Sequence, residues 1–505
     1  MPAVGLIIPA IAILSWLFGR PTDLFLLLFF VSFAKIKIPG LPGSLALPQL
    51  FMILMIGWAL LDAAIGKQKR PFSFERSTDI WPTLFLINVL LIMAVRGTGF
   101  AQLGGSTYGG ASYVRLLISI MFYFAAVRIR LSSKQVKVLL LLGVLGTLIP
   151  VTAELLTAYG GKSFVWLVPF VGDTRDLQQG IATTIGAAGK IERWVTFREL
   201  AFALMPVTYL FCRKKITRGI LIILMFLLIG LTGYRSEMTR LMLLVVLVSV
   251  YFSKTRAKTV VFWGVLGLIG FILLIVVSPL LPLSMQRAIS FLPGVSIGTD
   301  VVTGTELSSN FRFDMWRDYC IPNVPKYLLI GRGLAHDITG FAWLSAQWYS
   351  SSEFFYYMGS YHSGPFTLLL DFGLLGTVSF SLFFLLTIHD SWRTVHQYAS
   401  HQTSPAALYY GFLTVLLTYE IISFYFIYGD VLVFIRLLII AIQLRILKKN
   451  FLMGEPGAAA AEVGDQRSVV SSSTQQMKTG NRTLVNRWAR HRTGARNGPL
   501  PSAGR

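Results

Sequence analysis

The chain has 505 residues, of which 54% are hydrophobic and 13% charged, and its mean hydropathy of +0.65 is far above that of a soluble domain. Apolar runs of roughly 17–25 residues recur along it, and this is the length that crosses a bilayer core. The runs are continuous, which excludes the alternating pattern of an outer-membrane barrel. The net charge of +22 does not require a nucleic-acid partner, because Lys and Arg collect in the cytoplasmic loops of multi-pass proteins. The sequence therefore predicts an all-α, polytopic integral membrane protein.

Apolar segments follow one another along most of the chain. We expect membrane helices near 4–18, 22–34, 47–66, 79–95, 112–127, 136–158, 197–212, 217–233, 238–253, 259–281, 364–388, 406–427 and 430–447. The first two are short and flank Arg20 and Pro21, so they form either a tight hairpin or one irregular pair. The chain is thus expected to have about twelve or thirteen spans.

Four basic clusters set the expected orientation. They lie at 67–76, 128–137, 213–218 and 254–258, each two spans from the next, so all of them can face the cytoplasm. Two long loops, at about 159–196 and 282–360, are then expected on the outer face, the second of them before the third-last span.

The composition changes sharply after Phe451. Up to about residue 450 the chain reads as one transmembrane domain in contact with membrane lipid, whereas 451–505 is rich in Ala, Gly, Ser and Gln with scattered arginines. This last stretch lacks the apolar content to fold, and we expect a disordered basic tail in the cytoplasm.

A polar stretch opens the third-last span, in the sequence YHSGPFTLLLDFGLLG from Tyr361 to Gly376. Ser363 can cap a helix there, and Pro365 suits its first turn. His362 would then lie just outside a helix N-terminus, where the helix dipole favours a neutral imidazole and attracts anions. A base beside an anion site suggests chemistry on a phosphorylated, membrane-held substrate. The alternative is an interfacial histidine without a role.

Charged residues inside spans are costly and need partners. Glu420 and Arg436 lie at similar depth in the last two spans, and we expect a structural ion pair between them. Several other arginines are expected to gather on the outer face, where they could hold phosphate oxygens or form local salt bridges. They are Arg193, Arg198, Arg235, Arg240 and Arg312.

Three stretches together resemble one family of proteins. HSGPFTLLLDFGLLG, TGYRSEMTRL and FRFDMWRDYCIPNVPKYLLIGRGL are similar, in that order, to motifs of the bacterial O-antigen ligase and O-antigen polymerase superfamily. The matching positions are His362, Asp371, Gly373 and Gly376 in the first stretch, Arg235 in the second, and Arg312, Trp316, Gly331 and Gly333 in the third. The resemblance covers roughly 190–390.

The resemblance implies an inverting glycosyltransferase that needs neither metal nor cofactor and that acts at the periplasmic face of a bacterial inner membrane. The donor would be a glycan on undecaprenyl diphosphate, and the acceptor another glycan or a lipid A-core sugar. His362 would act as base, and the arginines would hold the diphosphate. Asp371 is expected to support the site by packing or by pairing with an arginine, because nine residues of regular helix place it on the face opposite His362. Whether the chain is a ligase or a polymerase stays open.

Two other functions remain possible from the sequence. A transporter or flippase for lipid-linked or anionic substrates would also bury arginines, although such proteins tend to have internal repeats, and none is clear here. A structural protein of the cell envelope would tolerate replacement of His362.

Overall fold

The computed structural model describes residues 21–34, 47–66, 74, 77–99, 109–126, 129, 131–160, 194, 196–212, 214–290, 292, 294–295, 310–334, 352–397 and 405–453. Across these ranges the regular structure is helical and includes no strand, which confirms the all-α prediction. The apolar segment at 4–18, most of the loop at 159–196 with Arg193, parts of the loop at 282–360 and the tail beyond residue 453 lie outside the described residues.

The other twelve apolar segments coincide with helices. These are α2 (Pro21–Ala34), α3 (Leu47–Ala64), α4 (Ile80–Arg96), α5 (Gly110–Ala126), α6 (Ser133–Gly160), α8 (Phe197–Phe211), α9 (Lys215–Thr232), α10 (Arg235–Phe252), α11 (Arg256–Val277), the continuous helical stretch Gly364–Gln397, α18 (Pro405–Phe426) and α19 (Val431–Met453). Shorter elements are η2 (Ser77–Asp79), η5 (Ser278–Leu280), α12 (Leu283–Ile289), the π-helix η6 (Met315–Cys320), α14 (Ile321–Tyr327) and α15 (Ser352–Tyr357).

Within the described ranges, six helices are long and apolar enough to cross a membrane, and three shorter helices are also apolar. The six run over Leu47–Ala64, Ser133–Thr157, Lys215–Thr232, Arg256–Leu280, Gly364–Gln397 and Pro405–Phe426. The chain is therefore a multi-pass membrane protein, and the count of twelve or thirteen spans stays a prediction.

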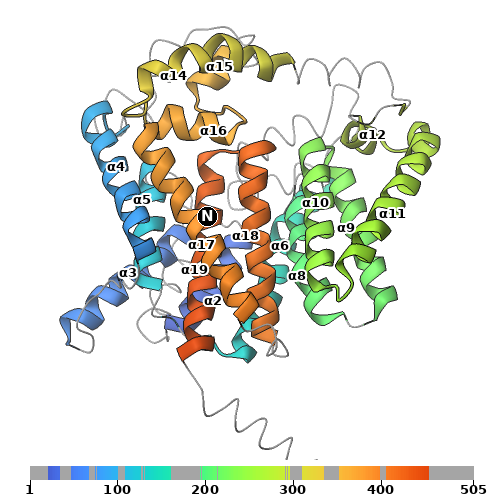
Figure 1. Cartoon of the computed structure of the whole chain (residues 1–505), viewed down its shortest axis with the longest axis horizontal. Coiled ribbons are helices and arrows are strands. Elements are labelled where there is room, and N and C mark those ends of the chain that lie inside the picture. Colours follow the sequence, from blue (N-terminus) through green and yellow to red (C-terminus); the bar gives the residue numbers. More distant parts are fainter. Residues whose placement is uncertain are drawn as a thin grey trace, which may run out of the picture. The chain divides into compact units, whose positions relative to one another are not determined.

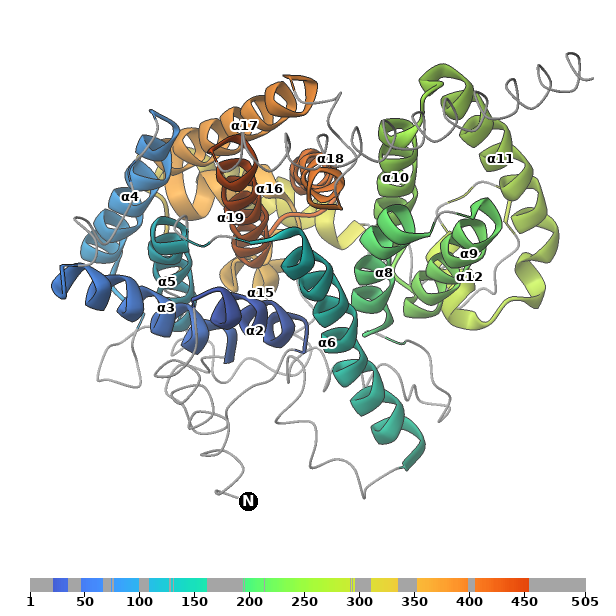
Figure 2. The ribbon, with the colours of Figure 1, turned by 90° about the horizontal axis from the view of Figure 1, so that it is seen from below.

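Helix α19 lies at the centre of the helices, as Figure 2 shows. Its Phe434 stacks on Phe85 of α4 at 4.9 Å between ring centroids and lies 5.3 Å from Phe380 of α17 (Gly373–Gln397). Farther along α19, Arg445 binds both carboxylate oxygens of Asp79 at 2.7 and 2.6 Å, and Tyr123 of α5 donates to the same carboxylate. Asp79 neutralises the charge of the buried Arg445, as a charge inside the helical core requires.

Helix α11 is the opposite case. It has the highest mean hydropathy of the candidate spans, 3.0, yet none of its residues is buried. Figures 1 and 2 both show it at the margin, beyond α9 and α10. Many of its apolar side chains are exposed in the protein alone, as expected of a helix that faces lipid.

By the clustering of contacts, the chain divides into two units, Met1–Lys448 and Lys449–Arg505. Of the second unit only the end of α19 is described. The predicted division into a membrane domain and a disordered tail at residues 450 and 451 stays a prediction.

Candidate active site at His362

His362 occupies a special backbone position at the start of the third-last span. Its φ is +52°, in a region that few non-glycine residues adopt. The indole of Trp316 donates a hydrogen bond of 2.8 Å to the carbonyl of Tyr361 and so holds the preceding peptide. Such a conformation persists only where its surroundings fix it, and it is typical of functional sites.

The short helix α16 (Gly364–Phe366) begins two residues after His362. Pro365 lies in its first turn, as the sequence suggested, and Ser363 is the N-cap residue. The Ser363 side chain makes no capping hydrogen bond; instead its carbonyl accepts bonds from the backbone N–H and the hydroxyl of Thr367. The helix start is therefore held through Thr367.

The imidazole of His362 is enclosed by aromatic rings. Phe311, Phe355 and Tyr428 lie 6.2, 5.7 and 5.3 Å away between ring centroids, and the buried Nδ1 has no hydrogen-bond partner. Burial and the positive charge of Arg312 lower the pKa of His362 to about 4, against a smaller opposing effect of Asp430. The ring is neutral at physiological pH, so it can accept a proton. The sequence suggested a neutral ring from the helix dipole; in the structure, burial and Arg312 favour the neutral ring.

Arg312 supplies positive charge next to His362. It is half-buried, and burial lowers its pKa, while Tyr428 acts in the opposite direction. Among the described contacts no carboxylate lies within ion-pair distance of Arg312. A guanidinium that is partly desolvated and not neutralised is suited to an anionic ligand, and its planar fork fits phosphate oxygens.

The turn between α18 and α19 completes the surroundings of His362. The hydroxyl of Thr367 donates to the carbonyl of Gly429 at 3.2 Å, which ties this turn to the start of the span. Tyr428 lies close to Asp430; burial raises the pKa of Tyr428, and Asp430 acts in the same direction. The charges of Arg198 and Arg312 both act on Tyr428. The sequence analysis missed Tyr428 and Asp430 as site residues, although it placed this turn between the last two spans.

The outer arginines differ in their partners. Arg198, in the first turn of α8, lies 2.7 Å from Glu199 and 3.6 Å from Glu237, and its side chain is 26% exposed. Because it also acts on Tyr428, the structure brings Arg198 near the same turn as Arg312. Arg235 is the first residue of α10 and is half-buried. Arg193 lies outside the described residues.

Arg240 belongs to a different environment. Its side chain is only 3% exposed and contacts Glu237 at 3.0 Å, Glu420 at 2.9 Å and the hydroxyl of Tyr419 at 3.1 Å. Arg436 lies 3.5 Å from the other oxygen of Glu420 and is 47% exposed. The expected pairing of Glu420 with Arg436 is thus the longer of the two contacts that Glu420 makes. We leave Arg240 out of the phosphate-binding proposal because two carboxylates already neutralise it.

These contacts form one chain of alternating charges. It runs Arg198, Glu237, Arg240, Glu420, Arg436 and joins α8, α10, α18 and α19. We call it the ion chain. The charge of Arg198, at one end of the ion chain, acts on Tyr428 beside His362. The ion chain therefore connects the site to buried side chains of the last two helices.

Asp371 lies behind His362 in a second polar cluster. Tyr361 donates a hydrogen bond of 2.8 Å to one of its oxygens, and the guanidinium of Arg332 lies 3.6 Å away. Arg332 also donates to the carbonyl of Tyr356 at 2.9 Å and lies over the rings of Tyr356 and Tyr361. The sequence analysis quoted the glycines around Arg332 without singling out the arginine itself. The cluster orders Tyr361, the residue directly before His362.

The helix around Asp371 is not a regular α-helix. Thr367–Phe372 form the π-helix η9, after which Gly373 has a φ of +67° and α17 (Gly373–Gln397) begins. The prediction that Asp371 lies opposite His362 assumed 100° per residue throughout, and this does not hold here. Asp371 is nevertheless directed to Tyr361 and Arg332, the partners that the structure gives it.

Two glycines explain how η9 is held. The backbone N–H groups of Arg332 and Gly333 donate to the carbonyls of Leu370 and Asp371 at 2.6 and 3.0 Å. A Cβ on Gly331 would collide with the backbone carbonyl of Asp371, so only glycine allows this approach. The Gly-x-Gly pattern of the sequence thus holds the segment around Gly331 and Gly333 against the π-helix that follows His362.

Comparison with known proteins agrees with the resemblance seen in the sequence. Residues 220–381 match the family whose model is described as O-antigen ligase. The matched stretch includes Arg235, Arg312, His362 and Asp371. No curated protein matches the chain. The resemblance to the O-antigen ligase and polymerase superfamily is confirmed over this stretch, and it supports glycan transfer of that general type on lipid-linked substrates.

Proposed function

We propose that this chain transfers a glycan from undecaprenyl diphosphate to a hydroxyl group of another glycan or of a lipid A-core sugar. The reaction would take place at the outer, periplasmic face of a bacterial inner membrane. The observation that carries the proposal is His362, a neutral imidazole whose Nδ1 has no hydrogen-bond partner among the described residues, beside Arg312, which has no carboxylate partner among them. This pair lies near the N-terminal end of a candidate span, within the stretch that matches the family.

His362 would act as the general base. The acceptor oxygen attacks the anomeric carbon of the donor sugar, and its proton passes to the imidazole as the bond from that carbon to the phosphate oxygen breaks. The electron pair leaves with the diphosphate. A single displacement of this kind inverts the configuration at the anomeric carbon. A positioned base contributes about 10²–10⁴-fold to such a rate.

Arg312 would stabilise the charge that develops on the leaving diphosphate. Its guanidinium is available because no carboxylate occupies it among the described contacts. Arg235 would assist from α10, and Arg193 is proposed from the sequence alone, whereas Arg198, like Arg240, already contacts two carboxylates and is left out. Fixed cations aimed at developing negative charge can serve the purpose that a divalent metal has in other transferases, so we propose a metal-independent reaction.

Donor binding would raise the pKa of His362. The positive charge of Arg312 helps to keep the pKa of His362 low in the free protein. A diphosphate bound to Arg312 would offset that charge, and the pKa of the imidazole would rise toward the pH at which the reaction runs. Proton transfer is most efficient when these two values are close. The imidazole would thus become a stronger base when the donor is in place.

The test is transfer by the purified chain in detergent, with a lipid-diphosphate glycan as donor and EDTA present. We compare wild type with His362→Asn, because asparagine tolerates a positive φ better than alanine does. The matched control is His389→Asn, which replaces an exposed histidine of α17. We expect His362→Asn to lose activity by about 10²–10⁴-fold and His389→Asn to keep it.

Three other outcomes would count against the proposal. A folded His362→Asn variant with full activity would show that His362 is not the base. A wild type that loses activity in EDTA and regains it with Mg²⁺ would overturn metal independence. If the wild type moves lipid-linked glycan across vesicles but joins no sugars, the chain is a flippase.

A further inference from the structure

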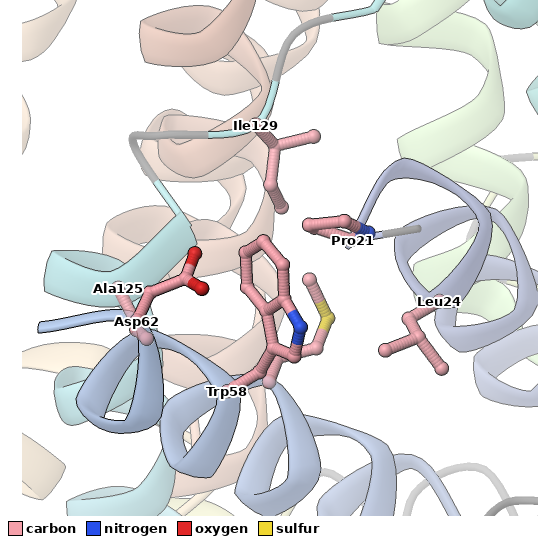
Figure 3. Close-up of a pocket in the computed structure, with 8 residues that line it drawn as sticks. Pro21, Leu24, Trp58, Asp62, Ala125 and Ile129 are labelled. Carbon is pink, nitrogen blue, oxygen red and sulfur yellow. The ribbon is translucent and has the colours of Figure 1, made fainter. Parts of the chain in front are cut away.

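One face of α3 borders a small cavity away from His362. Met55, Trp58 with Ala59, and Asp62 are spaced three to four residues apart, so they lie along the same face of the helix. The cavity has a volume of about 100 Å³, and Figure 3 shows Trp58 and Asp62 beside it. The remaining walls come from α2, the end of α5 and the segment that follows α5, through Pro21, Leu24, Ala125 and Ile129.

Asp62 is the one charged group in this lining. Its exposed fraction is 8%, and the contacts of the described residues include no hydrogen bond or ion pair to it. It also lies in the last turn of α3, where the negative end of the helix dipole disfavours a carboxylate. A buried carboxylate in an unfavourable position and without a partner indicates a ligand that supplies the missing charge.

The residues that line the cavity limit which kind of ligand can bind there. Leu24, Met55 and Ile129 are apolar and almost fully buried, and the indole of Trp58 lies next to the carboxylate. Indole faces attract organic cations, and a carboxylate completes their recognition. A bare metal ion would need several oxygen ligands, which a single carboxylate does not provide. We propose that the cavity binds an organic ammonium group, with Asp62 as its counter-ion and Trp58 as its aromatic wall.

The position of the cavity makes a lipid headgroup one source of that ammonium group. Asp62 is two residues from the end of a candidate span, the level at which lipid headgroups lie. The basic cluster at 67–76 follows directly in the sequence and would attract the phosphate of the same lipid. On the predicted topology this is the cytoplasmic side, opposite His362. A soluble amine is the other possible source, and the experiment separates the two.

The experiment measures lipid retention by the purified full chain in detergent, using native mass spectrometry. The probes are phosphatidylethanolamine, the same lipid with its amine acetylated, and dodecylammonium as a competitor. The variants are Asp62→Asn and Trp58→Leu, with Asp23→Asn as the matched control, because Asp23 is an exposed carboxylate on α2. We expect wild type and Asp23→Asn to retain the amine lipid about tenfold better than the acetylated lipid, and Asp62→Asn to lose this preference.

Each arm gives a decisive outcome. Displacement of the lipid by dodecylammonium supports recognition of the ammonium group itself, and binding of dodecylammonium without the lipid assigns the site to a soluble amine. Equal retention of both lipids by the wild type, with no binding of dodecylammonium, would overturn the proposal. So would an unchanged preference in Asp62→Asn. Should Asp62→Asn fail to fold, an unchanged preference in Trp58→Leu would overturn it equally.

Discussion

Arg312 and Arg240 are the same residue type in opposite circumstances. Arg240 is almost completely buried and touches two carboxylates and a tyrosine hydroxyl. Arg312 is half-buried, lies beside His362 and has no carboxylate partner among the described contacts. Partners within the fold neutralise Arg240, whereas Arg312 is available for the anionic ligand that we propose. The number of oxygen partners, more than the depth of burial, distinguishes the two arginines.

The largest expected effect comes from opening the ion chain. Arg240→Met leaves Glu237 and Glu420 buried without their shared cation, and we expect it to lower the free energy of unfolding by about 3–5 kcal/mol. The measurement is denaturant unfolding in detergent. Arg436→Met is the control at the exposed end of the ion chain, with an expected loss of about 0–1 kcal/mol. Equal losses in both variants would contradict the distinction.

The second effect concerns Arg312 itself. Arg312→Gln should reduce kcat/KM for the lipid-diphosphate donor by about 10²–10³-fold, because it removes a fixed charge from the leaving group. Its unfolding should stay close to that of the wild type. The control in the same loop is Arg317→Gln, since Arg317 is 72% exposed and pairs with Asp314 and Asp318. If Arg317→Gln loses as much activity as Arg312→Gln, general charge rather than position matters.

A third test addresses the clamp behind His362. In Gly331→Ala the new Cβ meets the carbonyl of Asp371, and we expect a loss of about 1–3 kcal/mol in stability. Gly219→Ala in α9 has no atom within 4 Å of the new Cβ and should be neutral or slightly stabilising. Thermal unfolding of the two variants side by side checks this. A neutral Gly331→Ala would show that the outer loop can move away from η9.

The smallest effect is a shift in pH dependence. The free protein holds His362 with a pKa of about 4, so kcat/KM should fall only as the pH drops through that value. In Arg312→Gln the lowering by Arg312 is lost, and the acid limb should move up by about one pH unit. The acid limb of the kcat profile, which reports the pKa of His362 in the donor complex, should also lie at a higher pH than the acid limb of the kcat/KM profile. Coincident limbs in all three profiles would argue that Arg312 does not act on His362.

The lowered pKa of His362 also makes the stability of the fold depend on pH. An unfolded chain binds a proton at His362 near the ordinary pKa of 6.5, whereas the folded chain does so only near 4. Stability therefore decreases as the pH falls from about 6.5 to 4, because protonation favours the unfolded state. His362→Asn should remove this part of the dependence, which unfolding measured at pH 7 and pH 5 would detect.

Most of the helices could be predicted from the sequence because a bilayer demands long apolar runs. The predicted segment at 217–233 corresponds to α9 at Lys215–Thr232, and that at 406–427 to α18 at Pro405–Phe426. The break at η9 could not be predicted, because Thr367–Phe372 contain neither proline nor glycine to interrupt a regular helix. It depends on backbone contacts with the outer loop, around Gly331 and Gly333.

The sequence could identify those site residues whose side chains are energetically costly near a membrane. His362 and the outer arginines stood out because charged and titratable groups are rare near a membrane. Partners were not predictable, since Arg332 meets Asp371 and Tyr428 meets His362 only through folding. Arg240 shows the reverse problem: the sequence grouped it with Arg312, and only its contacts separate the two.

The ion chain also has a consequence for biosynthesis. Arg240 and its partner Glu420 are 180 positions apart, so at about 5–20 residues per second the ribosome needs about 10–40 s between them. Glu237, one helical turn before Arg240, is already present when α10 is made. We expect Glu237 to neutralise Arg240 in the bilayer until α18 has been synthesised and Glu420 can pair with Arg240. Replacing Glu237 by Gln should then impair membrane insertion of chains truncated before α18, which a glycosylation-tag insertion assay would measure.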